Sequence, residues 1–214
     1  MTQTKMTDLL APNREGFNKD PGGYAALAWM RWAIAQNMAG LPVDPTQPPK
    51  AEDLKDPILW LTQAQALSVS AVTLAKHQPA FSEMPLPVRG VCDSQYCAIV
   101  LMLVGFSLEV SLKAMIIIRD GVDAFMKMES KHLHHRLSEL AAFIPDLSAK
   151  DHGILKMLTH FVYWAGRYPD PGTKRHDDME DVFTLAETHQ ISAHDVFDLA
   201  GRVLGHVRAL VPDD

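Results

Sequence analysis

With 214 residues, the chain is long enough for one domain with extensions, and 47% hydrophobic and 21% charged residues can build a real core. The net charge of −6 and the pI near 5.9 exclude the global basic surface that most nucleic-acid binders carry, although a local basic patch stays open. Cys92 and Cys97 form neither a CxxC pair nor a disulfide framework, and the N-terminal segment has no apolar signal-peptide region. We therefore expect a cytoplasmic protein.

The N-terminal part of the chain alternates helical segments with proline-rich connections. Residues 1–22 are polar and contain two prolines, so we expect an arm. Periodic apolar residues predict helices at 25–38 and 57–77. The four prolines of 41–56 and the three of 79–91 predict stiff, extended connections, and connections of this length are often functional.

The chain is organised around a segment that we predict to form one long helix at about 94–120. Asp93 and Ser94 are suitable N-cap residues at its start, and Gly121 can take the left-handed conformation that ends a helix. The apolar residues of this segment point in nearly every direction, which is typical of a helix buried in a core or a membrane.

The charges of this segment favour a core over a membrane. The run without strongly polar residues, 98–106, is far shorter than the ~20 residues that a membrane span needs. Glu109 and Lys113 would lie near the middle of such a span. We therefore expect no membrane partner.

Helices follow to the end of the chain, and no strand pattern is visible. Ser148 and Ser192 are N-cap candidates for two of these helices. The predicted helices are 122–128, 134–143, 148–164, 179–188 and 192–211. The sequence thus predicts an all-α helical bundle around the long buried helix, with an arm at 1–22 and a single domain at 23–211.

Three segments resemble one protein family. Residues 105–114, GFSLEVSLKA, place E-x-x-L-K-A inside a long apolar helix, and residues 131–137, KHLHHRL, loosely resemble an H-x-L-x-x-L segment. Residues 164–169, WAGRYP, resemble a W-x-G-R-Y-P ending. Together they are similar to HEPN domains (higher eukaryotes and prokaryotes nucleotide-binding), over residues 93–171.

The resemblance implies an α-helical bundle that interacts with nucleotide or RNA, as a toxin–antitoxin or defence-related component. It also implies a homodimer and a nucleotidyltransferase-type antitoxin partner. The ribonucleases of this family carry an Arg followed by a His with four to six residues between them, and no Arg of this chain has that spacing. We therefore expect weak or absent endoribonuclease activity, independent of metal, and no cofactor.

Five residues are the first candidates for a binding site. Glu109 and Lys113 lie one helical turn apart, and Arg167 and Tyr168 end an apolar helix that should pack nearby. We predict that these four line one polar groove that binds an anion, and His132 is the histidine that matches the family pattern. Secondary candidates are Lys174, Arg175 and His176.

Each candidate also has a purely structural interpretation. Glu109 and Lys113 can form an ion pair at an exposed helix edge, the histidines can be surface residues, and Arg167 can complement a helix dipole. Accordingly, the alternative function is a non-catalytic dimeric protein–protein interaction module, with a small-molecule-binding regulatory bundle as a third. For the homodimer, the small residues Ser107, Ser111 and Ala114 are the candidate contact row.

Overall fold

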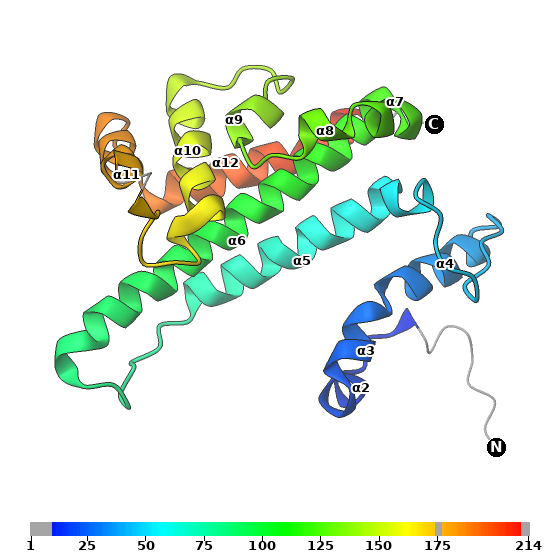
Figure 1. The fold of residues 1–214 in the computed structure, drawn as a ribbon, viewed down its shortest axis with the longest axis horizontal. Coiled ribbons are helices and arrows are strands. Elements are labelled where there is room, and N and C mark those ends of the chain that lie inside the picture. The colour runs from blue at the N-terminus through cyan, green and yellow to red at the C-terminus, as the bar shows by residue number, and fades with distance from the viewer. Residues whose placement is uncertain (1–9, 174–176, 211–214) are drawn as a thin grey trace. The chain divides into compact units, whose positions relative to one another are not determined.

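The computed structural model describes residues 10–173 and 177–210, and these form helices and no strand. The protein is an all-α helical bundle with a long central helix, as the sequence predicts (Figure 1). The chain divides into two compact units, Met1–Leu59 and Trp60–Asp214, and each is described by itself.

The first unit contains three short helices, α2 (Arg14–Lys19), α3 (Pro21–Ala26) and α4 (Ala28–Met38), and the 3-10 turn η1 (Asp53–Lys55). Asn13 and Asp20 accept backbone hydrogen bonds at the starts of α2 and α3, which is the usual chemistry of an N-cap. The described part of the predicted arm is therefore helical. The predicted helix at 25–38 is present but is divided at Leu27, which ends α3 and precedes α4.

The second unit is built on helix α6, Leu86–Asp120 (Figure 1). It ends where the sequence predicts, at Gly121 with a φ of 84°, but it begins eight residues before the predicted start. Asp93 and Ser94 therefore lie inside the helix and cap nothing. The reason is Pro87, which the first turn of a helix tolerates because its missing N–H has no partner there anyway.

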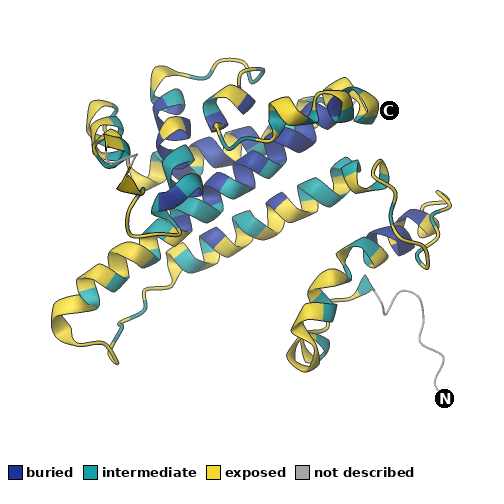
Figure 2. Cartoon of the chain, viewed as in Figure 1, coloured by how far each residue is buried: buried dark blue, intermediate teal, exposed yellow. Residues whose placement is uncertain are grey.

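Only the stretch from Val100 to Ile117 of α6 lies in the core. All of the buried residues of α6 fall in this stretch, whereas Leu86 is 76% exposed and Val91 is 54% exposed (Figure 2). The fully buried side chains of this core come mainly from α6, α10 (Ala149–His160) and α12 (Ala193–Gly205), and include Leu108, Leu112, Met115, Leu155, Leu158 and Leu199.

A close approach between helices explains the small residues of α6. A Cβ added at Gly105 would lie 2.5 Å from a methyl group of Val162, in the π-helical turn Phe161–Ala165 that continues α10. Ser107, Ser111 and Ala114 are also fully buried within the monomer. A homodimer therefore has to use a different surface from the row that the sequence suggested.

Helix α5 (Pro57–Lys76) is confirmed at its predicted position and runs antiparallel to α6, since Trp60 contacts Phe125 beyond the end of α6 and Leu74 accepts a hydrogen bond from Tyr96 near its start. Both helices are long and apolar enough to cross a membrane, by length and composition alone. The apolar window of α6 is 67% buried in the protein, as expected for a core helix. That of α5 is only 11% buried, so much of its apolar surface lies outside the core.

Short helices complete the second unit: α7 (Val122–Lys127), α8 (Glu129–His132), α9 (Leu137–Leu140), α11 (Asp177–Thr188) and α13 (Val207–Leu210). Capping boxes fix the starts of α10 and α12, where Ser148 pairs with Asp151 and Ser192 with Asp195. The predicted helix at 134–143 is correspondingly shorter, because the chain from His132 to α9 crosses between helices as a loop.

Candidate functional site

A network of charged side chains is buried at the middle of α6. The carboxylate of Glu109 lies 2.7 Å from the Lys113 ammonium through Oε1 and 2.7 Å from Nδ1 of His135 through Oε2. Glu109 is 6% exposed and Lys113 is 8% exposed, so neither is at a solvent-exposed helix edge. Because each of these charges has a partner, the core can hold both without an uncompensated ion.

His135 closes this network from the loop that follows α8. A carboxylate can only accept a hydrogen bond, so Nδ1 of His135 is the donor toward ionised Glu109. The imidazole ring meets the ring of Tyr163 edge-on, with centroids 5.0 Å apart, and Phe106 lies on another side. These contacts hold His135 in one orientation.

The same loop is fixed at its other end by α10. The backbone N–H of Leu137 donates to Oγ1 of Thr159 over 3.1 Å, and Thr159 itself donates to the carbonyl of Leu155. Arg136 lies between His135 and Leu137, so both neighbours of Arg136 are tied to the bundle. Two contacts distant in sequence therefore position this arginine.

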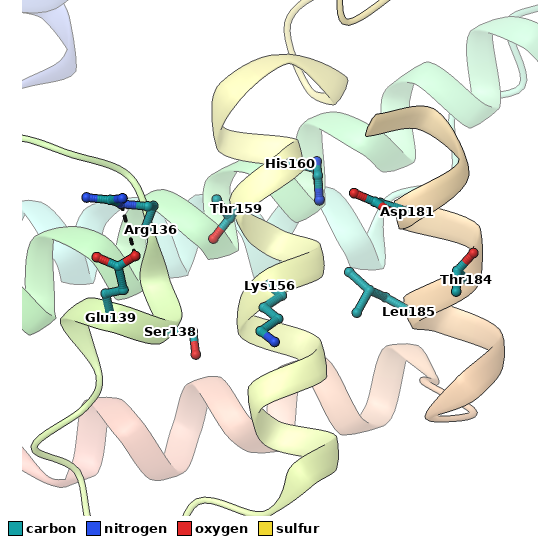
Figure 3. Close-up of a pocket in the computed structure, with 9 residues that line it drawn as sticks. All are labelled: Arg136, Ser138, Glu139, Lys156, Thr159, His160, Asp181, Thr184 and Leu185. Atoms are coloured by element: carbon teal, nitrogen blue, oxygen red, sulfur yellow. Dashed lines mark ion pairs between the residues drawn. The ribbon is translucent and has the colours of Figure 1, made fainter. Parts of the chain in front are cut away.

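Arg136 opens onto a pocket of about 400 Å³ between α9, α10 and α11 (Figure 3). The pocket is lined mainly by polar and charged side chains that three separate helices supply. The lining residues are Arg136, Ser138, Glu139, Lys156, Thr159, His160, Asp181, Thr184 and Leu185. Figure 3 shows Lys156 and His160 on α10 and the side chains of Asp181 and Leu185 directed from α11 toward them.

The charges of this pocket are only partly compensated. Arg136 pairs with Glu139 over 3.2 Å at one side of the pocket. Lys156, His160 and Asp181 form no ion pair with any residue that the structure describes. Burial lowers the pKa of the adjacent His134, and Arg136 lowers it further, so His134 is neutral near pH 7. The pocket thus offers the ammonium group of Lys156 and the imidazole of His160 to a ligand.

The predicted site residues that the structure describes lie in three places, with Glu109 and Lys113 in one, Arg167 and Tyr168 in another, and His132 in a third. Glu109 and Lys113 belong to the buried network described above. Arg167 and Tyr168 border a separate small cavity of about 230 Å³, where they meet Gln95 and Ile99 of α6. Since ten residues of helix separate Ile99 from Glu109, the two places are about 15 Å apart along α6. The structure does not bring the two pairs into one cavity.

Arg167 and His132 have structural partners of their own. Arg167 donates to the backbone carbonyl of Tyr163 and lies over the ring of Tyr168, with 5.4 Å to its centroid. The ring of His132 stacks on Phe125 at 5.3 Å. The secondary candidates, Lys174, Arg175 and His176, lie outside the described residues.

Sequence reasoning did not select His135 or the pocket residues of α10. Lys156 and His160 are four residues apart in a predicted helix, so their common face could have been noticed. His135 stood beside the selected His132, but only the fold identifies it as the partner of Glu109.

The part of the chain that the structure describes contains no group of three or more His, Cys, Asp or Glu side chains that could hold a metal ion. Comparisons of the chain with protein-family models, with curated proteins and with solved structures find no match. The interpretation of the site therefore depends on its geometry and on the sequence resemblance.

Proposed function

We propose that the protein is a HEPN-like helical protein that binds a nucleotide or a short stretch of RNA in the pocket between α9, α10 and α11. One observation carries the proposal: Lys156 and His160, without ion-pair partners among the described residues, lie in one pocket with Arg136. Lysine and arginine are the usual ligands of phosphate groups.

The remaining lining suits the rest of a nucleotide. Asp181 and Thr184 can accept or exchange hydrogen bonds with ribose hydroxyls, and Leu185 offers apolar contact to a base. A volume of about 400 Å³ is within the range of small-molecule sites. The net charge of −6 disfavours binding along a long phosphate backbone, so the ligand is small or the contact is local.

In this proposal the buried network serves binding rather than cleavage. Glu109 fixes His135, and His135 with Leu137 fixes the position of Arg136. The Arg–His spacing of the family ribonucleases is missing, so endoribonuclease activity is weak or absent and needs no metal or cofactor. The cellular role that goes with this is a cytoplasmic toxin–antitoxin or defence component, with a nucleotidyltransferase-type antitoxin as partner.

A binding titration of the full chain with a fluorescent adenine nucleotide and a labelled single-stranded RNA tests this proposal. Lys156→Ala should weaken binding about tenfold, because a charge-assisted contact is lost. Lys127→Ala on α7 is the matched control, since Lys127 is exposed and lines none of the cavities described here. Unchanged affinity in Lys156→Ala would contradict the pocket, and a loss in Arg167→Ala instead would move the ligand to the second cavity.

A gel assay of the same RNA tests the statement on cleavage. We expect the wild-type protein to leave the RNA intact over hours. Cleavage that the wild type performs and His135→Ala does not would show that the buried network is catalytic.

A second candidate function is a dimeric interaction module without catalysis, and the exposed apolar surface favours it. Leu86, Val91 and Val69 are 76%, 54% and 52% exposed, and all three lie on α5 or the first turns of α6. Sedimentation should give a dimer for the wild type and a monomer for the double variant Leu86→Glu/Val91→Glu. A wild-type monomer at micromolar concentration would contradict this candidate.

A further inference from the structure

The largest cavity described here lies away from the polar pocket, between the end of α5 and the starts of α6 and α12. Its volume is about 670 Å³. One face of α6 supplies Asp93, Tyr96, Cys97, Val100 and Leu101, which recur every three or four residues. The C-terminal end of α5 and the chain after it form a second wall, and Phe197 of α12 forms a third.

Aromatic and aliphatic side chains dominate this cavity. The Tyr96 hydroxyl donates to the carbonyl of Leu74 over 3.0 Å, so its polar group is satisfied and its ring is held in the wall. Phe81 packs edge-on against the same ring, with centroids 6.1 Å apart. Phe197 adds a second aromatic ring from α12. The walls are therefore suited to an apolar ligand.

The charge of the cavity selects among apolar ligands. Among the described residues that line it, Asp93 is the only acidic one, His77 is the only histidine, and none is a Lys or Arg. Among the residues that the structure describes, Asp93 forms no ion pair. A carboxylate that lines the same cavity as the rings of Tyr96 and Phe197 favours a cation there, since both its charge and the negative faces of the rings attract one.

We propose that this cavity binds a small amphiphilic cation, an aliphatic chain that carries an ammonium group, with the ammonium beside Asp93. The aliphatic part lies between Val100, Leu101 and Phe197. The site is independent of the proposed nucleotide pocket, because no described residue lines both cavities.

Isothermal titration of the full chain with three probes of equal chain length tests the charge preference. Octyltrimethylammonium should bind about threefold more tightly than octanol, and octyl sulfonate more weakly than octanol, as expected for one exposed carboxylate. Asp93→Asn should remove this preference and leave octanol affinity unchanged. Asp123→Asn, an exposed acid on α7, is the matched control and should change nothing.

The location is tested by the two free cysteines of α6. Cys97 lines the cavity, whereas Cys92, on the same helix, does not. Saturating octyltrimethylammonium should slow the alkylation of Cys97 severalfold. Mass spectrometry of the intact Cys92→Ser variant follows this reaction. Alkylation of Cys92 in a Cys97→Ser variant should keep its rate.

Filling the cavity gives the second test. Ala193→Phe should weaken all three probes, with an unchanged helical circular dichroism spectrum as evidence of folding, whereas Lys156→Ala should leave them unchanged. Equal affinity for the three probes in the wild type, unprotected Cys97, or unchanged affinity in Ala193→Phe would each overturn the proposal. None of these outcomes bears on the nucleotide pocket, so the two proposals can fail separately.

Discussion

The buried pair of Glu109 and Lys113 allows a stability experiment whose outcome depends on the third member of the network. We consider Glu109→Leu, Lys113→Met and the double variant, which replace charges by apolar side chains of similar length. The single variants leave different partners behind. Glu109→Leu leaves the Lys113 ammonium, whose side chain is 10% exposed, without an ion-pair partner, whereas Lys113→Met leaves Glu109 still bonded to His135.

The magnitudes follow from the burial of the pair. Two unit charges about 3 Å apart attract by roughly 6 kcal/mol at an effective dielectric constant of about 20. This is similar to the several kcal/mol that it costs to bury the two ions, so the intact pair is close to neutral for stability. Glu109→Leu should therefore cost about 3–5 kcal/mol, since it removes the attraction and keeps the buried lysine. Lys113→Met should cost about 2 kcal/mol, because the hydrogen bond from His135 remains. The double variant should lie within about 1 kcal/mol of the wild type.

Urea unfolding followed by circular dichroism at 222 nm measures all four free energies of unfolding, and the m-value reports whether the transition stays two-state. Asp198→Asn is the control, because Asp198 pairs with Arg202 at the same i,i+4 spacing while both are half-exposed. It should cost no more than about 0.5 kcal/mol. The reasoning would be refuted if the double variant lost as much unfolding free energy as the two single variants together, or if the two single variants lost equal amounts.

Three further predictions concern the rest of the bundle. Burial alone would raise the pKa of Asp151, but hydrogen bonds from Arg202 of α12 and from the α10 N-cap Ser148 outweigh that effect and lower the pKa. Ionised Asp151 thus stabilises the fold above about pH 4. The cost of Asp151→Asn in urea unfolding should shrink as the pH falls below that value. Gly105→Ala should lower the unfolding free energy by about 1–3 kcal/mol through overpacking, whereas Gly201→Ala, also helical but with open space around it, should raise it by about 0.5–1 kcal/mol. Leu112→Ala should cost about 2–5 kcal/mol, and Val69→Ala on the exposed face of α5 less than about 0.5 kcal/mol, which thermal unfolding at one protein concentration can distinguish.

Local signals were sufficient for most helices. Ser148 and Ser192 begin α10 and α12 as predicted, because a serine N-cap satisfies backbone N–H groups whatever surrounds it. Pro87 misled the prediction of α6, since a proline inside the first turn is indistinguishable in sequence from a proline of a loop. The buried part of α6 was predictable because its apolar residues point in every direction, which only a core can accommodate.

The candidate site was less predictable, because its parts come together only through the packing of α9, α10 and α11. Arg136, Lys156 and Asp181 are far apart in sequence, and only Arg136 lies in one of the three segments that carry the family resemblance. The prediction of a groove that joins Arg167 to Glu109 assumed that the end of one helix reaches the middle of another. In the structure the π-helical turn that ends α10 passes Gly105 and brings Arg167 to the first part of α6 instead.

The sequence nevertheless predicted one physical requirement that explains the site. A Glu and a Lys in an apolar helix need polar partners once the helix is buried, and this reasoning holds without any knowledge of the fold. It could not identify the partner, which is His135, 26 residues from Glu109. The consequence goes beyond charge compensation. Because the His135 contact and the bond from Leu137 to Thr159 flank Arg136, the requirement to satisfy a buried carboxylate also determines where an arginine enters the pocket. A variant such as Glu109→Leu should thus impair both stability and ligand binding, whereas Lys156→Ala should impair binding alone.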